Sequence, residues 1–324
     1  MGEFDLIQRY FKRPVRRSPL GVGDDCALLA PRPGMQLAVS SDMLVEGRHF
    51  LSTVDPVRLG HKALAVNLSD LAACGAEPLA FTLALSLPAV DEAWLAGFSQ
   101  GLLALADAHG CDLVGGDTTR GPLNICITVF GEVPAGQALL RSGARVGDDL
   151  WVSGTLGDAR LALEMFRGTL EVPAEVFAAA RLRMEAPTPR VALGTALRGI
   201  ATSAVDISDG LLGDLAHVLR ASGVGAVVDT SVAIDLIANG RSGSPAAGLF
   251  SVEKQLELVL AGGDDYELAF TAPAAAADRV RAAGAASATP VTRIGSVVAG
   301  SGVQLQDGAG AAVGGRFASF DHFA

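Results

Sequence analysis

The sequence predicts a mixed α/β protein of two domains, and three observations support this prediction. The chain has 324 residues, which is longer than one hydrophobic core usually supports. Half of its residues are apolar and 19% are charged, a balance that excludes a disordered chain. Predicted strands and helices alternate, but the first half also has consecutive strands. A mixed α/β or α+β class therefore fits better than a purely parallel sheet.

The clearest helix of the first half is expected over residues 55–73. Asp55 is suited to be its N-cap, and Pro56 stands at the first helical position. Asn67 and Asp70 are three residues apart and therefore share one face of this helix. That face can present a carboxylate to a ligand.

Three further elements are expected before the domain boundary. They are a helix over 91–109 and strands over 111–114 and 123–133. A connection that contains Pro and Gly follows, and we place the boundary there, between domains 1–140 and 141–324.

The second half has its clearest unit over 204–229, where a strand, an acidic turn, a helix and a strand follow one another. This order is typical of a ligand site in an α/β protein. We interpret 147–149 as a structural turn, 274–288 as an alanine-rich helix and 300–315 as surface turns.

Six short acidic clusters lie next to glycine or serine. Small neighbours let a ligand approach the backbone, and carboxylates are the oxygen ligands that Mg²⁺ prefers, often together with substrate phosphates. One Gly-Asp pair alone is more often a turn. Six clusters, several of them at the end of an apolar run, predict a multi-metal phosphate site. They occupy 23–25, 40–42, 67–70, 115–117, 206–210 and 262–265.

The charge of the chain limits its partners. A formal net charge of -10 disfavours nucleic acid and anionic membranes, because both are bound through Lys and Arg. No Gly-x-x-x-x-Gly-Lys-Ser/Thr motif occurs, which excludes a P-loop. Glu3 and Asp5 stand where a signal peptide would be basic and then apolar. We therefore expect a cytoplasmic protein.

The cysteines point to the same compartment. They form no C-x-x-C pair and have apolar neighbours in sequence, which predicts buried free thiols in a reducing environment and no zinc site or disulfide. They are Cys26, Cys74, Cys111 and Cys126.

Long stretches of the chain resemble the thiamine-monophosphate kinase family, which belongs to the superfamily of aminoimidazole ribonucleotide synthetase. The resemblance runs nearly end to end, and its most specific stretches are 21–27, 44–50, 62–70, 115–122 and 262–267. It implies a two-domain fold of the aminoimidazole ribonucleotide synthetase type and a homodimer whose first domains pair their sheets. It also implies ATP-dependent phosphorylation of thiamine monophosphate to thiamine diphosphate, the last step of thiamine diphosphate biosynthesis, with several Mg²⁺ ions.

The resemblance also implies roles for residues at matching positions. The implied metal ligands are Asp25, Ser40, Ser41, Asp42, Asp70, Asp117, Asp206 and Asp209. The implied ATP-binding residues are Gly116, Asp117, Arg141 and Ser208. The implied acceptor-binding residues are His49, Asp264 and Phe320. Catalytic roles fall on Asp117, Asp209 and Arg141. The family often has Glu at the position of Asp264 and Tyr or Trp at that of Phe320.

Each of these assignments has a structural alternative. Asp206 and Asp209 could be acids that favour a helix N-terminus. Arg141 could be a solvated linker arginine, and Ser208 could be a helix cap. Lys62, which matches the family's motif helix, could simply extend its amine to the surface.

Phosphoryl transfer gives these residue types a common purpose. A phosphomonoester acceptor has a second pKa of about 6 and is mostly dianionic at neutral pH, so it needs no general base. The obstacle is repulsion, since two unit charges about 4 Å apart cost roughly 4 kcal/mol at an effective dielectric constant near 20. Carboxylates alone would add to this repulsion, so they fit a phosphate substrate only together with Mg²⁺.

Other functions remain alternatives. Another ATP-using member of the superfamily, such as aminoimidazole ribonucleotide synthetase, is one. Selenophosphate synthetase requires a reactive Cys near the N-terminus, whereas the first Cys here is Cys26; the hydrogenase-maturation relative requires a C-terminal Cys, whereas the chain ends at Ala324. A non-catalytic acidic scaffold that holds cations belongs to a different class.

Overall fold

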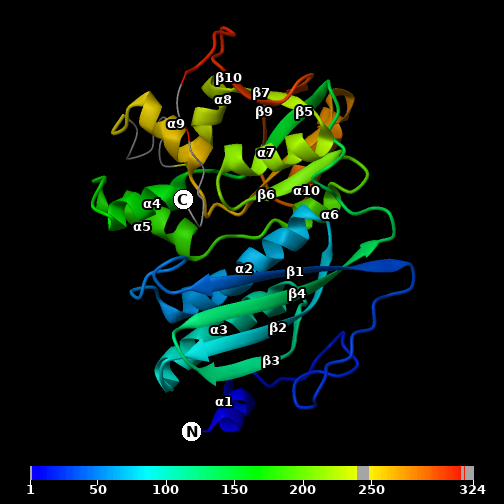
Figure 1. Ribbon diagram of the computed structural model, residues 1–324, viewed down its shortest axis with the longest axis vertical. Coiled ribbons are helices and arrows are strands. Elements are labelled where there is room, and N and C mark those ends of the chain that lie inside the picture. The colour runs from blue at the N-terminus through cyan, green and yellow to red at the C-terminus, as the bar shows by residue number, and fades with distance from the viewer. Residues whose placement is uncertain (1, 239–247, 315–316, 318–324) are drawn as a thin grey trace. The chain divides into compact units, whose positions relative to one another are not determined.

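The computed structural model divides the chain into two compact units (Figure 1). The first unit holds residues 1–138 except Ala72–Gly75, and the second unit holds Ala72–Gly75 and residues 139–324. The predicted division of roles between 1–140 and 141–324 stays a prediction. The structure describes residues 2–238, 248–314 and 317.

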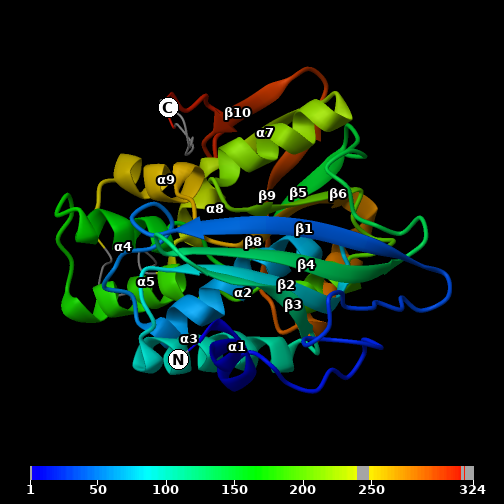
Figure 2. The same ribbon diagram turned by 60° about the horizontal axis from the view of Figure 1, so that its bottom comes forward.

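The first unit is built on a four-stranded sheet in the order β1-β4-β2-β3. β1, β4 and β2 pair antiparallel, and β3 is parallel to β2. Helices α2 and α3 lie on the same side of this sheet (Figure 2). The elements are α1 (Glu3–Tyr10), β1 (Met35–Val45), α2 (Pro56–Ala73), β2 (Glu77–Leu87), α3 (Glu92–Ala108), β3 (Asp112–Arg120) and β4 (Asn124–Pro134).

The two predicted helices of this unit are confirmed, and their capping residues explain where they begin. The carboxylate of Asp55 accepts hydrogen bonds from the backbone N–H groups of Val57 at 2.9 Å and Arg58 at 3.2 Å. Asp91 caps α3 in the same way. A side-chain acceptor satisfies N–H groups that have no partner inside the helix.

The strand predicted over 111–114 is longer than expected, because β3 continues through 115–117 to Arg120. Gly115, Gly116 and Asp117 pair with residues 82–84 of β2, after a register shift between Phe81 and Thr82. The glycines therefore belong to an irregular strand, and they bring Asp117 into the sheet.

The second unit contains a six-stranded sheet in the order β10-β7-β9-β5-β8-β6. All its pairs are antiparallel except β10 with β7. The elements are β5 (Asp148–Ser153), α4 (Asp158–Phe166), α5 (Ala174–Glu185), α6 (Val191–Ala196), β6 (Ser203–Ile207), α7 (Leu211–Ser222), β7 (Gly225–Asp229), α8 (Thr230–Ala233), η1 (Ile234–Leu236), α9 (Val252–Ala261), β8 (Glu267–Pro273), η3 (Ala274–Ala276), α10 (Ala277–Ala286), β9 (Val291–Val298) and β10 (Gly302–Gln306).

The predicted unit over 204–229 is confirmed as β6, α7 and β7. The two strands are not neighbours, because three other strands lie between them, and α7 contacts both β6 and β10.

Two turn predictions need correction. Asp148 and Asp149 begin β5, and residues 302–306 form β10 at the edge of the sheet.

The prediction of buried cysteines holds only for Cys111. Cys26 is exposed, and Cys74 and Cys126 are partly exposed, although all four thiols are free. The apolar neighbours of Cys26 in sequence did not translate into burial, because its segment forms no named helix or strand. Within the described residues, none of the helices is both long and apolar enough to cross a lipid bilayer.

Helices α2 and α3 cross at two glycines. A Cβ atom on Gly101 would lie 1.8 Å from the carbonyl oxygen of Val57, and one on Gly60 would lie 2.0 Å from that of Phe98. Each glycine of the crossing thus sits directly against the backbone of the other helix. This close approach fixes α2, which carries Asn67 and Asp70.

We predict that Gly101→Ala lowers the free energy of unfolding by about 1–3 kcal/mol, because the methyl group must push two backbones apart. Chemical denaturation measures this change. Gly97→Ala on the same helix is the control, since its Cβ would come no closer than 3.1 Å, to Pro56 Cβ, and would meet the backbone of α2 only at 3.6 Å, an ordinary contact distance. There the gain in helix propensity, about 1 kcal/mol, offsets the tighter contact. Equal effects of both substitutions would contradict the crossing as the cause.

Candidate active site

Two predicted acidic clusters meet in the first unit, where β1 lies beside α2. The hydroxyl of Ser40 donates to Asp70 Oδ2 at 2.5 Å, and the backbone N–H of Asp42 donates to Asn67 Oδ1 at 3.1 Å. Asn67 is buried and its amide also donates to the Ala63 carbonyl, so its orientation is fixed. The shared face of Asn67 and Asp70 is confirmed, and it faces β1.

Ser41 does not join this group. Side chains alternate along a strand, so Ser41 points away from the face that carries Ser40 and Asp42. Its hydroxyl instead contacts Thr128 Oγ1 at 3.0 Å and the carbonyl of Ile127 at 3.1 Å. Ser41 as a metal ligand stays a prediction.

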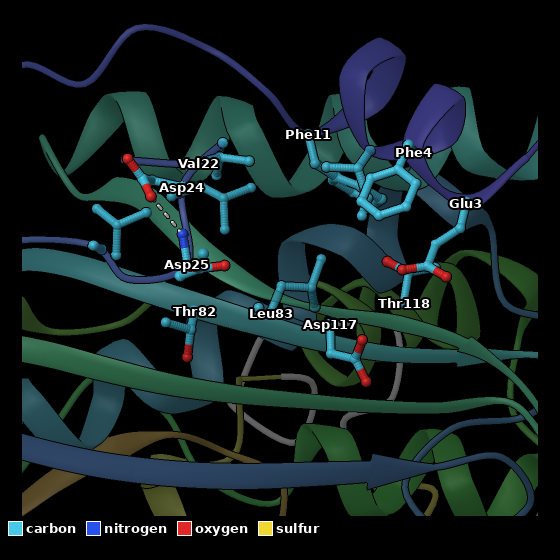
Figure 3. A pocket seen from close by; sticks show the side chains of 17 residues that line it. Glu3, Phe4, Phe11, Val22, Asp24, Asp25, Thr82, Leu83, Asp117 and Thr118 are labelled. Atoms are coloured by element: carbon cyan, nitrogen blue, oxygen red, sulfur yellow. Dashed lines mark hydrogen bonds between the residues drawn. The ribbon is translucent and has the colours of Figure 1, made fainter. Parts of the chain in front are cut away.

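A pocket of about 570 Å³ in the first unit contains two further clusters. Figure 3 shows Asp117 on β3, Asp25 on the segment after α1, and the side chains of Phe4 on α1 and Phe11 just after it above them. Asp24 Oδ1 accepts the N–H of Asp25 at 2.9 Å, which is a turn role. The pocket therefore combines exposed carboxylates with an apolar wall.

Gly116 has a geometric reason to be glycine. Its φ of +141° is rarely adopted by L side chains, and a Cβ there would lie 1.8 Å from the Leu83 carbonyl oxygen. The next residue is Asp117, so the glycine lets β3 pass close to β2 just before that carboxylate.

His49 lies in a loop held by a buried lysine. Its Nδ1 accepts the N–H of Val45 at 3.0 Å, so the neutral ring carries its proton on Nε2 and can donate from there. Lys62 is only 2% exposed, and its Nζ donates to the His49 carbonyl at 3.2 Å. The alternative that Lys62 extends to the surface is wrong.

In the second unit, the loop at 208–210 is held by an acid that the sequence analysis missed. Asp214 Oδ2 accepts the N–H groups of Ser208 at 3.1 Å, Asp209 at 3.0 Å and Gly210 at 3.1 Å. The N-cap of α7 is Gly210, with no side-chain cap, so Ser208 is not the cap. Burial raises the pKa of Asp214 to about 7, against the opposing effect of these backbone hydrogen bonds.

A signal for Asp214 was present in the sequence. It stands one residue before Leu215, on the apolar stripe of a predicted helix, where an acid is unexpected unless it has a partner.

The cluster at 262–267 lies against the same loop. The N–H of Asp264 donates to the Ser208 carbonyl at 2.8 Å, and that of Tyr266 donates to the Ile207 carbonyl at 2.9 Å. The Tyr266 hydroxyl donates to Asp264 Oδ1 at 3.1 Å. The structure therefore brings Ser208, Asp209 and Asp264 together within the second unit.

The other two acids of this cluster are structural. Both oxygens of Asp265 lie within 3.1 Å of the Gly157 nitrogen, and burial raises the pKa of this carboxyl well above its usual value. Glu267 is fully buried and pairs with Arg183 and Arg190.

Arg141 lies close to α7. The Ser222 hydroxyl donates to the Arg141 carbonyl at 3.2 Å and accepts the N–H of Gly143 at 3.1 Å. Burial lowers the pKa of His217, and the guanidinium groups of Arg141 and Arg220 lower it further, so both cations are near its ring.

Phe320, which was predicted to bind the acceptor, lies outside the described residues.

The donor set of these groups fits a hard divalent cation. Carboxylate and hydroxyl oxygens adjoin one another at Ser40 and Asp70, and such oxygens are the ligands Mg²⁺ prefers. Among residues 2–238, 248–314 and 317, however, no three His, Cys, Asp or Glu side chains are already gathered around one point. The fit therefore rests on chemistry and not on a completed cage.

Comparison with known proteins decides the family. Residues 23–133 match the family model "AIR synthase related protein, N-terminal domain", and 145–308 match its C-terminal counterpart. The thiamine-monophosphate kinase of Salmonella typhimurium is 49% identical over 277 residues, covering 84% of this chain and 83% of the relative. That of Escherichia coli K12 is 49% identical over 280 residues, with the same coverage. The chain belongs to the thiamine-monophosphate kinase family.

Solved structures agree with this assignment. The chain is similar to thiamine-monophosphate kinase from Stenotrophomonas maltophilia K279a, with a TM-score of 0.83 and 45% identity over 96% of both chains. It is also similar to AaThiL complexed with AMPPCP and TMP, with a TM-score of 0.76 and 29% identity over 99% of this chain and 96% of the other. The predicted mixed α/β fold of the aminoimidazole ribonucleotide synthetase type is confirmed.

The raised pKa of Asp265 predicts a pH-dependent stability. Its folded pKa lies above its unfolded value of about 4, so its contribution is full below that value and is lost as the pH rises through the folded pKa. Asp265→Asn mimics the protonated form and should show less decline of Tm above about pH 4. Thermal unfolding across a pH series measures this. Asp278→Asn, on an acid 98% exposed, is the control. Parallel curves for Asp265→Asn and wild type would contradict the prediction.

Proposed function

We propose that the protein transfers the γ-phosphoryl group of ATP to thiamine monophosphate, giving thiamine diphosphate and ADP, with Mg²⁺ bound. The observation that carries this proposal is the 49% identity to thiamine-monophosphate kinases across 84% of the chain. The similarity to a structure that holds AMPPCP and TMP supports the same pair of substrates.

The acceptor phosphate is its own nucleophile. One of its oxygens forms the new bond to the γ-phosphorus while the bond to the β–γ bridging oxygen breaks, and no proton has to be removed from a dianionic phosphate. Bound Mg²⁺ supplies the positive charge that lets the two polyanions approach. In the first unit Ser40, Asp42 and Asp70 would hold it, with Asp25 and Asp117 in the neighbouring clusters. In the second unit Asp206 and Asp209 would do so.

The remaining side chains bind the substrates. Arg141 and Ser208 are suited to the phosphates of ATP, since a guanidinium and a hydroxyl both donate to phosphate oxygens. The neutral His49 ring can donate from Nε2, which suits the phosphate of the acceptor. Asp264 is suited to the cationic thiazolium ring of thiamine. Phe320 is assigned to that ring by resemblance alone.

A homodimer and a cytoplasmic location complete the proposal. Leu37, Val39 and Met43 of β1 alternate with Ser40 and Asp42 and are 43%, 58% and 53% exposed. They give the sheet of the first unit an apolar face away from α2, which suits pairing with a second copy. The four free thiols fit a reducing compartment.

The proposal is tested by product identification. The purified protein is incubated with ATP, Mg²⁺ and either thiamine monophosphate or formylglycinamidine ribonucleotide. Thiamine diphosphate is the expected product. Turnover of the second acceptor alone would assign the chain to aminoimidazole ribonucleotide synthetase chemistry, and turnover of neither would favour a cation-holding scaffold.

We predict that Asp70→Asn and Asp117→Asn each lower kcat by about 100-fold or more, because each removes a carboxylate that would hold the Mg²⁺ that offsets phosphate repulsion. Thermal stability should change little, since Asn can still accept the hydrogen bond from Ser40. Steady-state kinetics and thermal melting measure the two effects. Asp107→Asn, an exposed acid paired with Arg13 and Arg16, is the control. Equal losses of activity and stability would argue against the metal role.

Chelation gives a prediction without mutation. Excess EDTA should abolish formation of thiamine diphosphate, and excess Mg²⁺ should restore it, because the acidic clusters cannot bind phosphates without cations. Chromatographic detection of the product measures this. Full activity with every divalent cation chelated would contradict the proposal.

A further inference from the structure

Asp214 is a buried acid that binds backbone groups of the loop before it. It is 4% exposed, and one carboxylate oxygen accepts three consecutive N–H groups, those of Ser208, Asp209 and Gly210, at 3.0–3.1 Å. These residues connect β6 to α7. Within the described residues, no other side chain accepts a hydrogen bond from these three N–H groups.

Three consecutive N–H groups that converge at a helix N-terminus would otherwise form an anion-binding site for a phosphate. Here the protein's own carboxylate already occupies them. A substrate phosphate therefore cannot be held by the backbone of this loop. A ligand can therefore bind the side-chain oxygens of Ser208 and Asp209, which suit a cation and its associated phosphate.

The loop is also held from the opposite direction. The Ser208 carbonyl accepts the N–H of Asp264, at 2.8 Å, from the segment before β8. Asp214 and Asp264 thus fix both polar groups of the Ser208 backbone. With its backbone fixed on both sides, Ser208 has only its side chain free to adjust.

We propose that Asp214 is a positioning residue of the kinase site, which occupies the N–H groups of 208–210 and so presents Ser208 and Asp209 to Mg²⁺ and ATP. This inference rests on the proposed function. The geometry assigns the role to the acceptor oxygen of Asp214. An asparagine in its place provides the same oxygen, whereas an alanine provides none.

The experiment compares Asp214→Ala and Asp214→Asn with the wild type, and uses Asp278→Ala, on an acid 98% exposed, as the control. Kinetics are measured at varied Mg²⁺ and varied ATP, and hydrogen exchange mass spectrometry follows peptides that cover 206–212. We expect slow exchange at 208–210 in the wild type and in Asp214→Asn. We expect Asp214→Ala to exchange fast there and to lose activity by about 100-fold, with a higher Mg²⁺ requirement.

Three results would overturn the inference. One is fast exchange at 208–210 in the wild type. Another is Asp214→Asn with slow exchange but with the activity loss expected of the alanine variant, because charge and not the acceptor would then matter. The third is Asp214→Ala with fast exchange and an unchanged Mg²⁺ requirement. The first two do not depend on the folding of Asp214→Ala. An inactive wild type would instead reject the proposed function, while the exchange data would still report on the contact.

Discussion

The loops of the proposed site are held by buried carboxylates. Burying a carboxylate costs much free energy unless the group has hydrogen-bond or charge partners. Asp214, Asp265 and Glu267 are all nearly or fully inaccessible, and each one binds the chain near a proposed functional residue. Asp214 holds the loop of Ser208 and Asp209 by three backbone N–H groups. Because each buried acid needs partners, it holds in place the loop that carries the more accessible acids.

This gives neighbouring acids different tasks within one cluster. Asp24 accepts the N–H of Asp25 and closes a turn, which leaves the side chain of Asp25 exposed in the pocket. Asp265 faces inward to Gly157, whereas Asp264 is half-buried and contacts the Tyr266 hydroxyl. In each pair one carboxylate supports the backbone, and the other is the one that we propose contacts a ligand. Two adjacent acids in such a cluster therefore do not supply two metal or substrate ligands.

Sequence reasoning succeeded where the determining interactions are local. The start of α2 follows from Asp55 and Pro56, whose effects act within one turn. It ended the strand over 111–114 too early, because glycine is depleted in strands, and the pairing that keeps 115–117 in the strand comes from β2, about thirty residues earlier. Asp214 was missed for a different reason, because its partners are local. An acid among the apolar residues of a helix signals a buried partner, but backbone N–H groups have no signature in the sequence, so only the fold shows that Asp214 binds the loop at 208–210.

The backbone of the 262–267 cluster shows what this support achieves. Asp264 and Tyr266 have φ values of +67° and +52°, a conformation that costs a non-glycine residue about 1–2 kcal/mol. Hydrogen bonds from their N–H groups to the carbonyls of Ser208 and Ile207 hold them there. The strained segment and the 206–210 loop thus stabilise each other, and Asp214 fixes the second of them. A change that loosened either partner would relax both, so the residues proposed for ATP and for the acceptor are mechanically coupled within the second unit.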